Sequence, residues 1–319
     1  MTAAGGVPGR FPRWFPASSD AGVGFVDATV THRPRITVVV LSRNRRDELL
    51  HTLGRLEALP EAPPLIVVDN GSTDGSPARV AGAHPDVALV ALAGNEGAAA
   101  RTLGVRAART DYVAFSDDDS WWEPGALRRA VELLDAHPTV ALLAAEVLVG
   151  SEGRLEPTCT AMADSPLAAR ASLPGPRVLG FVACGAVVRR DAYLAAGGFH
   201  PRYGVGGEEA LLAAGLASDG WDLVYVDELR ARHHPSPRRD RPARRAGAQR
   251  NDLWSTWLVR PWPAALRRTG ALLAPVPRDG AVLRGTIVAV GGLPWVLRER
   301  HAVPAAVERD LRRLEAATT

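Results

Sequence analysis

Three consecutive carboxylates, Asp117, Asp118 and Asp119, stand where the apolar run YVAF (112–115) ends and a helical pattern begins. Unpaired buried acids are costly, and neighbouring carboxylates raise one another's pKa, so such a cluster is stable in open water or around a divalent cation. Because the triplet follows an apolar run, we favour the cation, and an oxygen-ligated Mg²⁺ or Mn²⁺ usually also holds a phosphate. The alternative is a solvated turn that caps the following helix.

Two other polar clusters follow apolar runs in the same manner. Ser42 and Arg43 come directly after ITVVVL, and Asp69 and Asn70 end the run PLIVVD and begin its turn. Continuous apolar, β-branched runs are typical of strands that are covered on both faces. Doubly wound sheets bind ligands at the carboxyl ends of their parallel strands. We therefore expect the three clusters to meet in one site.

The chain around these clusters alternates between strand and helix patterns. Predicted strands cover residues 36–41, 64–69, 87–92, 112–115, 181–190 and 221–228. Predicted helices lie in RRDELLHTLGRLEAL, AAARTLGVRAAR, GALRRAVELLDAH, ALLAAGLASDG, PWPAALRRTGALL and VPAAVERDLRRLEAA. Repeating β-α units predict an α/β fold, a mixed and mostly parallel sheet with helices on both faces. We expect an extended lead-in at 1–34, a catalytic domain at 35–240 and a C-terminal helical appendage at 241–319.

Composition narrows the chemistry and the location. The chain has 319 residues and 46% hydrophobic content, enough for one large domain with an appendage. All 38 basic residues are arginine, which excludes a catalytic lysine but suits bidentate phosphate binding. Two cysteines are too few for a disulfide framework, and the N-terminus lacks the apolar core of a signal peptide. The best apolar run, 285–297, is too short to span a bilayer. We expect a cytoplasmic protein, with the inner face of the plasma membrane as an alternative location.

The order of these motifs resembles that of the family 2 glycosyltransferases, which are inverting enzymes with the GT-A fold. The resemblance covers residues 36–236 and rests on six elements. They are ITVVVLSRNR, LIVVDNGSTDGS, a helix with Gly97 and Arg101, the acidic triplet, a Gly-Gly-Glu-Glu segment and a late histidine. The resemblance implies transfer of a sugar from a nucleotide-diphosphate sugar to an acceptor hydroxyl. It also implies a divalent metal, Mn²⁺ or Mg²⁺, that neutralises the leaving diphosphate.

On the donor side, the resemblance assigns the acidic triplet and one histidine to the nucleotide sugar and its metal. Asp117 would contact the ribose and Asp119 would ligate the cation. Asp118, between them, has the less specific role. His233, or less favourably His234, matches the histidine that completes the metal site in many members. Without the resemblance, a His-His pair is more often part of a surface loop.

The same resemblance assigns the other two clusters and one arginine to the nucleotide. Asp69 and Asn70 match a carboxylate pair that reads the base, although many members have a second Asp where this chain has Asn70. Ser42 and Arg43 would contact the nucleotide, and Arg101 would approach the nucleotide or its diphosphate. The alternatives are that Asn70 belongs to a tight turn and that Arg101 is one solvated helix residue among many.

On the acceptor side, a general base is needed because an alcohol is a poor nucleophile at neutral pH. The family commonly carries a Glu-Asp pair where this chain has Glu208 and Glu209. The resemblance makes Glu209 the base, while Glu208 would help to hold the acceptor. Alternatively, both acids are present because the helix dipole favours them at an N-terminus. Members often carry Asp and Arg in place of Leu211 and Gly215, so a catalytically inactive nucleotide- or glycan-binding module is a second interpretation.

Two other classes are disfavoured by composition. Sugar-phosphate nucleotidyltransferases have a similar fold but typically use a lysine, which this chain lacks. A nucleic-acid-binding protein that used the arginine run 238–250 would lack the interleaved aromatic residues of proteins that bind single strands. We therefore expect a nucleotide-sugar donor and a glycan, lipid-linked or small-molecule acceptor, and no nucleic acid.

The C-terminal region alternates tryptophans with arginines, namely Trp254, Trp257, Arg260, Trp262, Arg267 and Arg268. This alternation resembles helices that lie on an anionic membrane surface. Peripheral membrane contact through these helices is therefore one expectation. Packing on the catalytic domain or a homodimer contact is the alternative.

Overall fold

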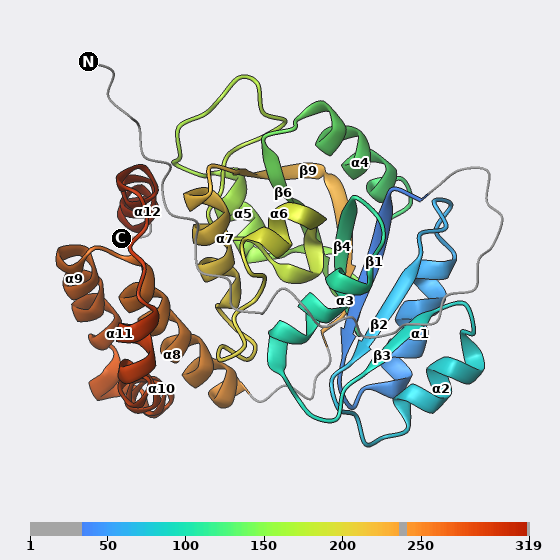
Figure 1. The fold of residues 1–319 in the computed structure, drawn as a ribbon, viewed down its shortest axis with the longest axis horizontal. Helices are drawn as coiled ribbons and strands as arrows, with labels where there is room; N and C mark the ends of the chain where they lie inside the picture. Colours follow the sequence, from blue (N-terminus) through green and yellow to red (C-terminus); the bar gives the residue numbers. More distant parts are fainter. Residues whose placement is uncertain (1–33, 236–240, 318–319) are drawn as a thin grey trace, which may run out of the picture.

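The computed structural model describes residues 34–235 and 241–317, in which a central sheet is flanked by helices and joined by a separate helical region (Figure 1). The nine strands have the order β3-β2-β1-β4-β8-β6-β9-β5, and β7 pairs with β6. The strands are β1 (Ile36–Ser42), β2 (Leu65–Asp69), β3 (Ala88–Ala91), β4 (Tyr112–Asp117), β5 (Ser120–Trp122), β6 (Val140–Val149), β7 (Arg154–Leu155), β8 (Ala186–Arg189) and β9 (Asp222–His233). The predicted lead-in at 1–34 lies outside the described residues, apart from Pro34.

Strand directions give the mixed, mostly parallel sheet that the sequence predicts. Strand β1 is parallel to both β2 and β4, and β2 is parallel to β3. Strand β8 runs antiparallel to β4 and β6, and β5 runs antiparallel to β9, whereas β6 and β9 are parallel. Along β1, Val38 and Val40 enter the core on one face while Val39 and Leu41 enter the core on the other. Burial on both faces explains why this strand is apolar throughout.

Helices cover both faces of the sheet and form the C-terminal region. The α-helices are α1 (Arg46–Glu57), α2 (Ser76–Ala83), α3 (Arg101–Ala107), α4 (Ala126–Ala136), α5 (Pro157–Ala163), α6 (Arg190–Ala195), α7 (Glu208–Ser218), α8 (Arg241–Val259), α9 (Trp262–Leu273), α10 (Gly280–Gly291), α11 (Leu293–Glu299) and α12 (Ala305–Ala317). Short 3₁₀ turns are η1 (Gly97–Ala100), η2 (Ala183–Gly185) and η3 (Val276–Arg278).

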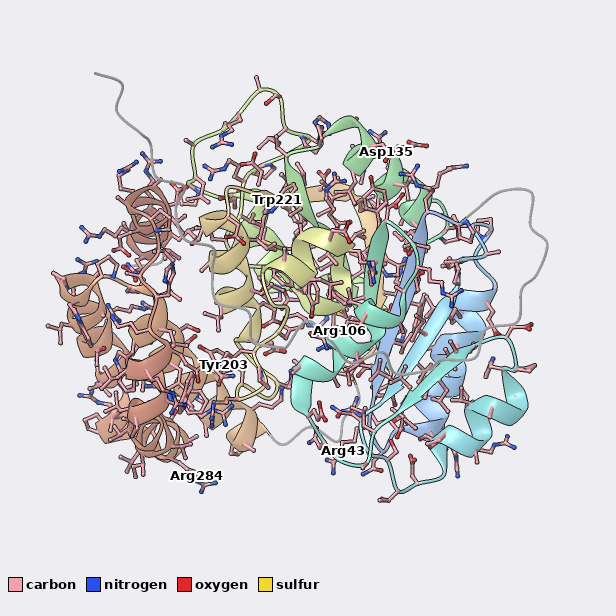
Figure 2. All side chains as sticks on the ribbon, in the orientation of Figure 1. Arg43, Arg106, Asp135, Tyr203, Trp221 and Arg284 are labelled. Atoms are coloured by element: carbon pink, nitrogen blue, oxygen red, sulfur yellow. The ribbon has the colours of Figure 1, made fainter. Side chains whose placement is uncertain are left out.

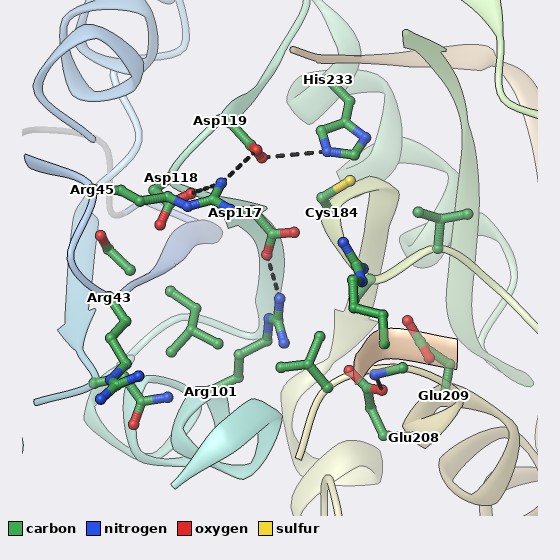
Figure 3. Close-up of a pocket in the computed structure, with 18 of the residues that line it drawn as sticks. Arg43, Arg45, Arg101, Asp117, Asp118, Asp119, Cys184, Glu208, Glu209 and His233 are labelled. Carbon is green, nitrogen blue, oxygen red and sulfur yellow. Dashed lines mark hydrogen bonds and ion pairs between the residues drawn. The ribbon is translucent and has the colours of Figure 1, made fainter. Parts of the chain in front are cut away.

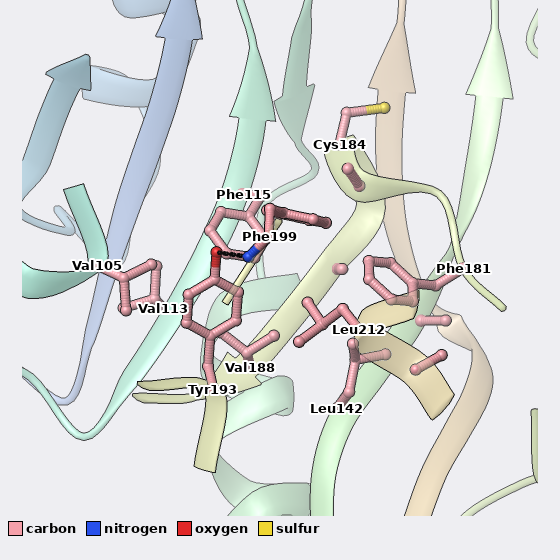
Figure 4. Packing of buried hydrophobic residues seen from close by; sticks show 14 of the residues in the cluster. Val105, Val113, Phe115, Leu142, Phe181, Cys184, Val188, Tyr193, Phe199 and Leu212 are labelled. Atoms are coloured by element: carbon pink, nitrogen blue, oxygen red, sulfur yellow. Dashed lines mark hydrogen bonds between the residues drawn. The ribbon is translucent and has the colours of Figure 1, made fainter. Parts of the chain in front are cut away.

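Each face of the sheet has its own hydrophobic cluster. Helices α1 and α4 supply leucines to one cluster. On the other face, Val105 of α3, Tyr193 of α6 and Leu212 of α7 pack with Phe115 of β4 and with Phe199 (Figure 4). Tyr193 and Phe199 have ring centroids 5.9 Å apart. This packing fixes the positions of α3 and α7, whose first turns carry Arg101 and the Glu208-Glu209 pair.

Several strands differ from the sequence prediction, including the short strands β5 and β7, which were not predicted. Strand β6 lies at 140–149, where no strand was predicted, because a continuous apolar run cannot be told from a buried helix by periodicity. The strand predicted at 181–190 is reduced to β8 because the turn η2 precedes it. Strand β9 continues to His233 instead of ending near residue 228. The histidine is therefore held at a strand end.

A third hydrophobic cluster joins α7 to the C-terminal helices. Leu211 of α7 packs there with Trp254 of α8 and Val296 of α11. Arg260 is also buried and forms ion pairs with Glu308 at 2.6 Å and Glu315 at 2.5 Å. Trp254 and Arg260 therefore belong to the internal packing of this region. For these two residues, packing within the protein is favoured over contact with a membrane.

Some residues of the same alternation remain at the surface. Trp262 is 51% exposed, with the Arg300 guanidinium 3.9 Å from its ring centroid, and Arg267 is also exposed. No single helix among the described residues is long and apolar enough to cross a membrane. Helices α10 and α11 meet that criterion together, but they are bent by 58° at the break between them.

Candidate active site

A cleft of about 310 Å³ opens at the carboxyl ends of the parallel strands. Strand register brings Ser42 level with Asp69 on one side, and Leu41 level with Asp117 on the other. The convergence of the three polar clusters is therefore confirmed. The side chains that line the cleft and carry polar groups are Ser42, Arg43, Arg45, Asn70, Asn95, Arg101, Asp117, Asp118, Asp119, Cys184, Glu208, Glu209, His233 and Arg244.

Arg101 lies in the first turn of α3 and is only 3% exposed. It forms an ion pair with Asp117 through Nη2, while its Nε and Nη1 atoms are buried without a hydrogen-bond partner. Burial acts to lower the pKa of this guanidinium, but the carboxylates of Asp117 and Glu208 raise it above its ordinary value. Arg101 is therefore a buried cation with two unused donors, not a solvated helix residue.

Asp118 and Asp119 share a second arginine. The Nη1 atom of Arg45 lies 3.2 Å from Asp118 Oδ1 and 2.9 Å from Asp119 Oδ2. Burial raises the pKa of Asp118 to about 7, against the lowering effect of Arg45 and with further raising by the two neighbouring carboxylates. All three acids of the triplet are therefore partnered by arginine, two of them by Arg45 and one by Arg101.

His233 faces the triplet from the end of β9. Its Nε2 atom lies 3.3 Å from Asp119 Oδ1, and both side chains are almost fully buried (Figure 3). His234 instead packs against Trp121, with ring centroids 4.7 Å apart and the rings tilted by 39°, and its amide donates to the Asp119 carbonyl oxygen. Of the two histidines, His233 is thus the one beside Asp119.

Asp119 and His233 are the candidate metal ligands that the structure brings together. Among residues 34–235 and 241–317, no group of three or more His, Cys, Asp or Glu side chains is arranged to hold a metal ion. One carboxylate and one imidazole fit a cation that takes its remaining ligands from phosphate oxygens and water, as Mn²⁺ and Mg²⁺ do at nucleotide sites. Burial raises the pKa of the nearby Cys184 thiol well above its ordinary value, so Cys184 remains a neutral thiol and is a poor metal ligand.

The other residues predicted to contact the nucleotide lie in different positions relative to the cleft. Ser42 Oγ and Asp69 Oδ1 are buried without a hydrogen-bond partner, which is the condition of groups that await a ligand. Asp69 nevertheless lies behind the residues that line the cleft, and its Oδ2 accepts from the Ser72 amide at 2.9 Å. Arg43 is exposed at the rim.

The Asn70 amide is already used within the protein. Its Nδ2 donates to the Gly97 carbonyl oxygen at 2.9 Å, and its Oδ1 accepts from the Glu96 amide at 2.8 Å. These two bonds hold the loop that enters α3, and therefore position Arg101. The side chain lines the cleft but does not offer both of its polar atoms to a base.

Glu208 and Glu209 begin α7 on the side of the cleft opposite the acidic triplet (Figure 3). The helix starts after Gly207, which has φ +81°, and Glu208 accepts from the Gly206 amide. Burial raises the pKa of Glu209 to about 8, and the neighbouring Glu208 contributes in the same direction. Glu209 is therefore a half-buried carboxyl that is mostly protonated at pH 7 and becomes ionised as the pH rises through about 8.

Comparison with known proteins agrees with this arrangement. A family model described as glycosyl transferase family 2 matches residues 37–195. The chain belongs to this family. It is 26% identical over 276 residues to the N-acetylglucosaminyl-diphospho-decaprenol L-rhamnosyltransferase of Mycobacterium tuberculosis, an alignment that covers 73% of this chain and 88% of that protein. It is an enzyme of the glycosyltransferase class.

Two solved structures show the same fold as this glycosyltransferase. One is the mannosyltransferase PcManGT from Pyrobaculum calidifontis in complex with GDP-Man and Mn²⁺, with a TM-score of 0.51, 22% identity, and coverage of 93% of this chain and 90% of that one. The other is GalNAc-T7 with UDP, GalNAc and Mn²⁺, with a TM-score of 0.56, 14% identity, and coverage of 79% and 52%. The predicted GT-A fold is thus confirmed.

The two sides of the cleft meet through two glycines. Gly97, with φ +61°, begins η1, and a Cβ at this position would lie 2.5 Å from the Cα of Gly204. The Ala98 amide also donates to the Gly204 carbonyl oxygen at 2.9 Å. The turn η1, which leads into Arg101 of α3, is therefore in backbone contact with the loop that leads to Glu208.

Sequence reasoning missed several cleft residues, among them Arg45 and Arg244. Arg45 stands two positions after Arg43, and only the start of α1 determines which arginine of SRNRR reaches the carboxylates. Arg244 comes from α8, far along the chain, and lies within the arginine run 238–250, to which no role in the site was assigned. Leu211, one of the departures from the family pattern, lies in the third hydrophobic cluster and not in the cleft.

Proposed function

We propose that this glycosyltransferase moves a sugar from a nucleotide-diphosphate sugar to an acceptor hydroxyl with inversion, assisted by a divalent cation, with Glu209 as general base. The proposal rests on one observation: groups suited to an anionic donor lie on one side of the cleft, and a group suited to accepting a proton lies on the other. Arg101, with two unused donors, and the pair of Asp119 and His233 lie on one side, and a carboxyl with a pKa of about 8 lies on the other.

The donor is expected to bind along the carboxyl edge of β1, β2 and β4. Ser42 and Arg43 would contact the nucleotide, with the unpartnered Asp69 Oδ1 behind them. Asp117 would contact the ribose and Asp118 would support it, while Arg101 donates to the diphosphate through Nε and Nη1. Arg45 and the exposed Arg43 add positive charge where the anionic donor enters.

Asp119 and His233 would hold the divalent cation, Mn²⁺ or Mg²⁺. When bound, it would act as a Lewis acid that neutralises charge developing on the leaving diphosphate. The protein's own contribution at this point is Arg101, a cation that burial keeps in position before the substrate arrives.

The transfer is a single displacement in which all atoms are accounted for. The acceptor oxygen gives its proton to Glu209 and forms a bond to the anomeric carbon from the face opposite the diphosphate. The bond from that carbon to the diphosphate oxygen breaks, and its electron pair leaves with the nucleoside diphosphate. Glu208, held by the Gly206 amide, would hold the acceptor beside Glu209.

The acceptor class is proposed from the chain's relative. The M. tuberculosis protein is named for a diphosphate-linked decaprenol acceptor, and 88% of its length is aligned. We therefore propose a lipid-linked glycan as the acceptor of this enzyme.

Two binding measurements and one transfer assay test the proposal. A panel of nucleotide sugars should give a thermal shift with Mn²⁺ for the correct donor, because a bound ligand stabilises the folded state by mass action. Asp119→Ala should lose the Mn²⁺-dependent part of that shift. Glu209→Gln should retain the shift and lose transfer to a short-chain lipid-diphosphate acceptor. Donor binding without any transfer by the wild-type protein would instead support the inactive binding module.

A further inference from the structure

The largest group of exposed apolar side chains lies on α10 and α11, far from the acidic triplet in sequence. Five of the ten exposed large apolar residues among the described part of the chain are found there. They are Leu283, Ile287, Val288, Val290 and Leu297, with exposures from 45% to 63%. Together with Arg284 we call them the α10–α11 face. Exposed apolar groupings of this kind mark interaction surfaces.

The α10–α11 face cannot turn inward, because the opposite side of α10 is packed closely on α8. A Cβ at Gly285 would lie 2.3 Å from the Ala246 carbonyl oxygen, and a Cβ at Gly292 would lie 2.5 Å from Trp254 Nε1. Small residues on the inner side thus bring the two helices together. The branched residues on the outer side are left exposed by residues 34–235 and 241–317, the part of the chain that the structure describes.

The charge on this face has one sign. The segment from Gly280 to Arg298 contains two arginines and no acidic residue. Asp279, directly before it, accepts from the amides that begin α10 and pairs with Arg245 at 2.8 Å. Glu299, directly after it, lies 3.5 Å from both Arg298 and His200. Acids at both ends are therefore engaged in contacts within the protein.

We propose that the α10–α11 face binds the surface of an anionic lipid bilayer. Apolar side chains flanked by arginines are the pattern of a helix that lies in the bilayer interface, where the arginines reach the headgroups. Self-association about a twofold axis through this face would instead bring two copies of Arg284 together, which like charge disfavours. Arg284 and the cleft-rim residue Arg43 both lie along the lower margin of the molecule in Figure 2.

The test is co-sedimentation with sucrose-loaded vesicles made of equal parts phosphatidylcholine and phosphatidylglycerol, compared with vesicles of phosphatidylcholine alone. The wild-type protein should bind the anionic vesicles, and more strongly at low salt. Ile287→Asp should weaken binding by about tenfold or more, because it places a charge on the apolar face. Arg284→Glu should weaken it by roughly 30-fold, because two units of charge change beside an anionic surface.

Matched controls lie on β7, at an exposed site elsewhere in the molecule. Leu155→Asp and Arg154→Glu introduce the same side chains there and should bind vesicles like the wild type. Mn²⁺-dependent nucleotide binding should be equal in all five proteins, so failure here is distinct from failure of the proposed function. Equal binding to both vesicle types, or no binding, would overturn the proposal. A dimer that Ile287→Asp dissociates, without vesicle binding, would assign the face to a second copy.

Discussion

Ionisation of Glu209 should control transfer, and the structure gives the size of the effect. With a pKa of about 8, this carboxyl is about half ionised at pH 8, about one tenth at pH 7 and about one hundredth at pH 6. Because only the ionised form accepts the acceptor proton, kcat/KM should fall about 50-fold from pH 8 to pH 6. A divalent cation and a diphosphate together add little net charge, so the change should remain near pH 8 with both bound.

Substitutions of Glu209 and Glu208 distinguish the effect of the proposed base on activity from the effect of its neighbour. Glu209→Gln should lower kcat/KM by about 100-fold to 10,000-fold and remove the pH dependence. Glu208→Gln keeps an acceptor for the Gly206 amide but removes one cause of the raised pKa of Glu209. Its pH profile should therefore move to lower pH. A wild-type kcat/KM that is constant from pH 6 to pH 8, or a Glu209→Gln variant with near wild-type turnover, would refute the reasoning.

The same pKa predicts a measurement that needs no substrate. The pKa of Glu209 rises from an ordinary value of 4.5 to about 8 on folding, so the folded state binds the proton more tightly than the unfolded state. Stability from this group is therefore greatest below pH 4.5 and decreases as pH rises toward 8. Glu209→Gln should gain about 2–4 kcal/mol in free energy of unfolding relative to wild type between these pH values, allowing for partial solvation. Urea unfolding across this range measures the gain.

Three further predictions concern other contacts. Arg45→Gln removes the positive charge that Asp118 and Asp119 share. Because that charge competes with a metal ion for the same carboxylates, Mn²⁺ should bind about tenfold more tightly in the absence of donor. Electron paramagnetic resonance measures the affinity, and weaker binding would contradict this. Gly97→Ala should cost about 1–3 kcal/mol in thermal unfolding, whereas Gly94→Ala, with open space around it, should not. Arg260→Met removes the arginine that Glu308 and the half-buried Glu315 share, although Glu308 keeps Arg312 and Glu315 keeps Arg268. It should lower the free energy of unfolding by about 1–3 kcal/mol, read from urea denaturation; an unchanged free energy would contradict the role assigned to this ion pair.

The sequence predicts the sheet edge well because that prediction rests on local patterns. Apolar runs for β1, β2 and β4 and the polar residues after them are contiguous, and parallel pairing then brings Ser42, Asp69 and Asp117 together. The resemblance already favours His233 over His234, and the course of β9, which ends at His233, then brings its Nε2 atom to Asp119.

Other features depend on tertiary contacts that no local pattern encodes. The Asn70 amide could bind a base or a loop, and only the fold of 95–97 shows that the loop takes it. Arg101 resembles any helix arginine until the packing of α3 buries it beside Asp117. Arg244 reaches the cleft from a helix that begins more than a hundred residues after the triplet, so its role is set by how α8 docks on α7.

Helix α7 is apolar on nearly every side, and this has a consequence for how the enzyme can be shortened. Leu212 and Leu216 face the sheet, whereas Leu211 and Ala214 face the C-terminal helices. A fragment ending near residue 235 would expose the outer side of the helix that carries Glu209. Truncation to residues before 236 is thus predicted to loosen Glu209, the proposed proton acceptor, even though the residues of β1, β2 and β4 that are proposed to contact the donor would be retained.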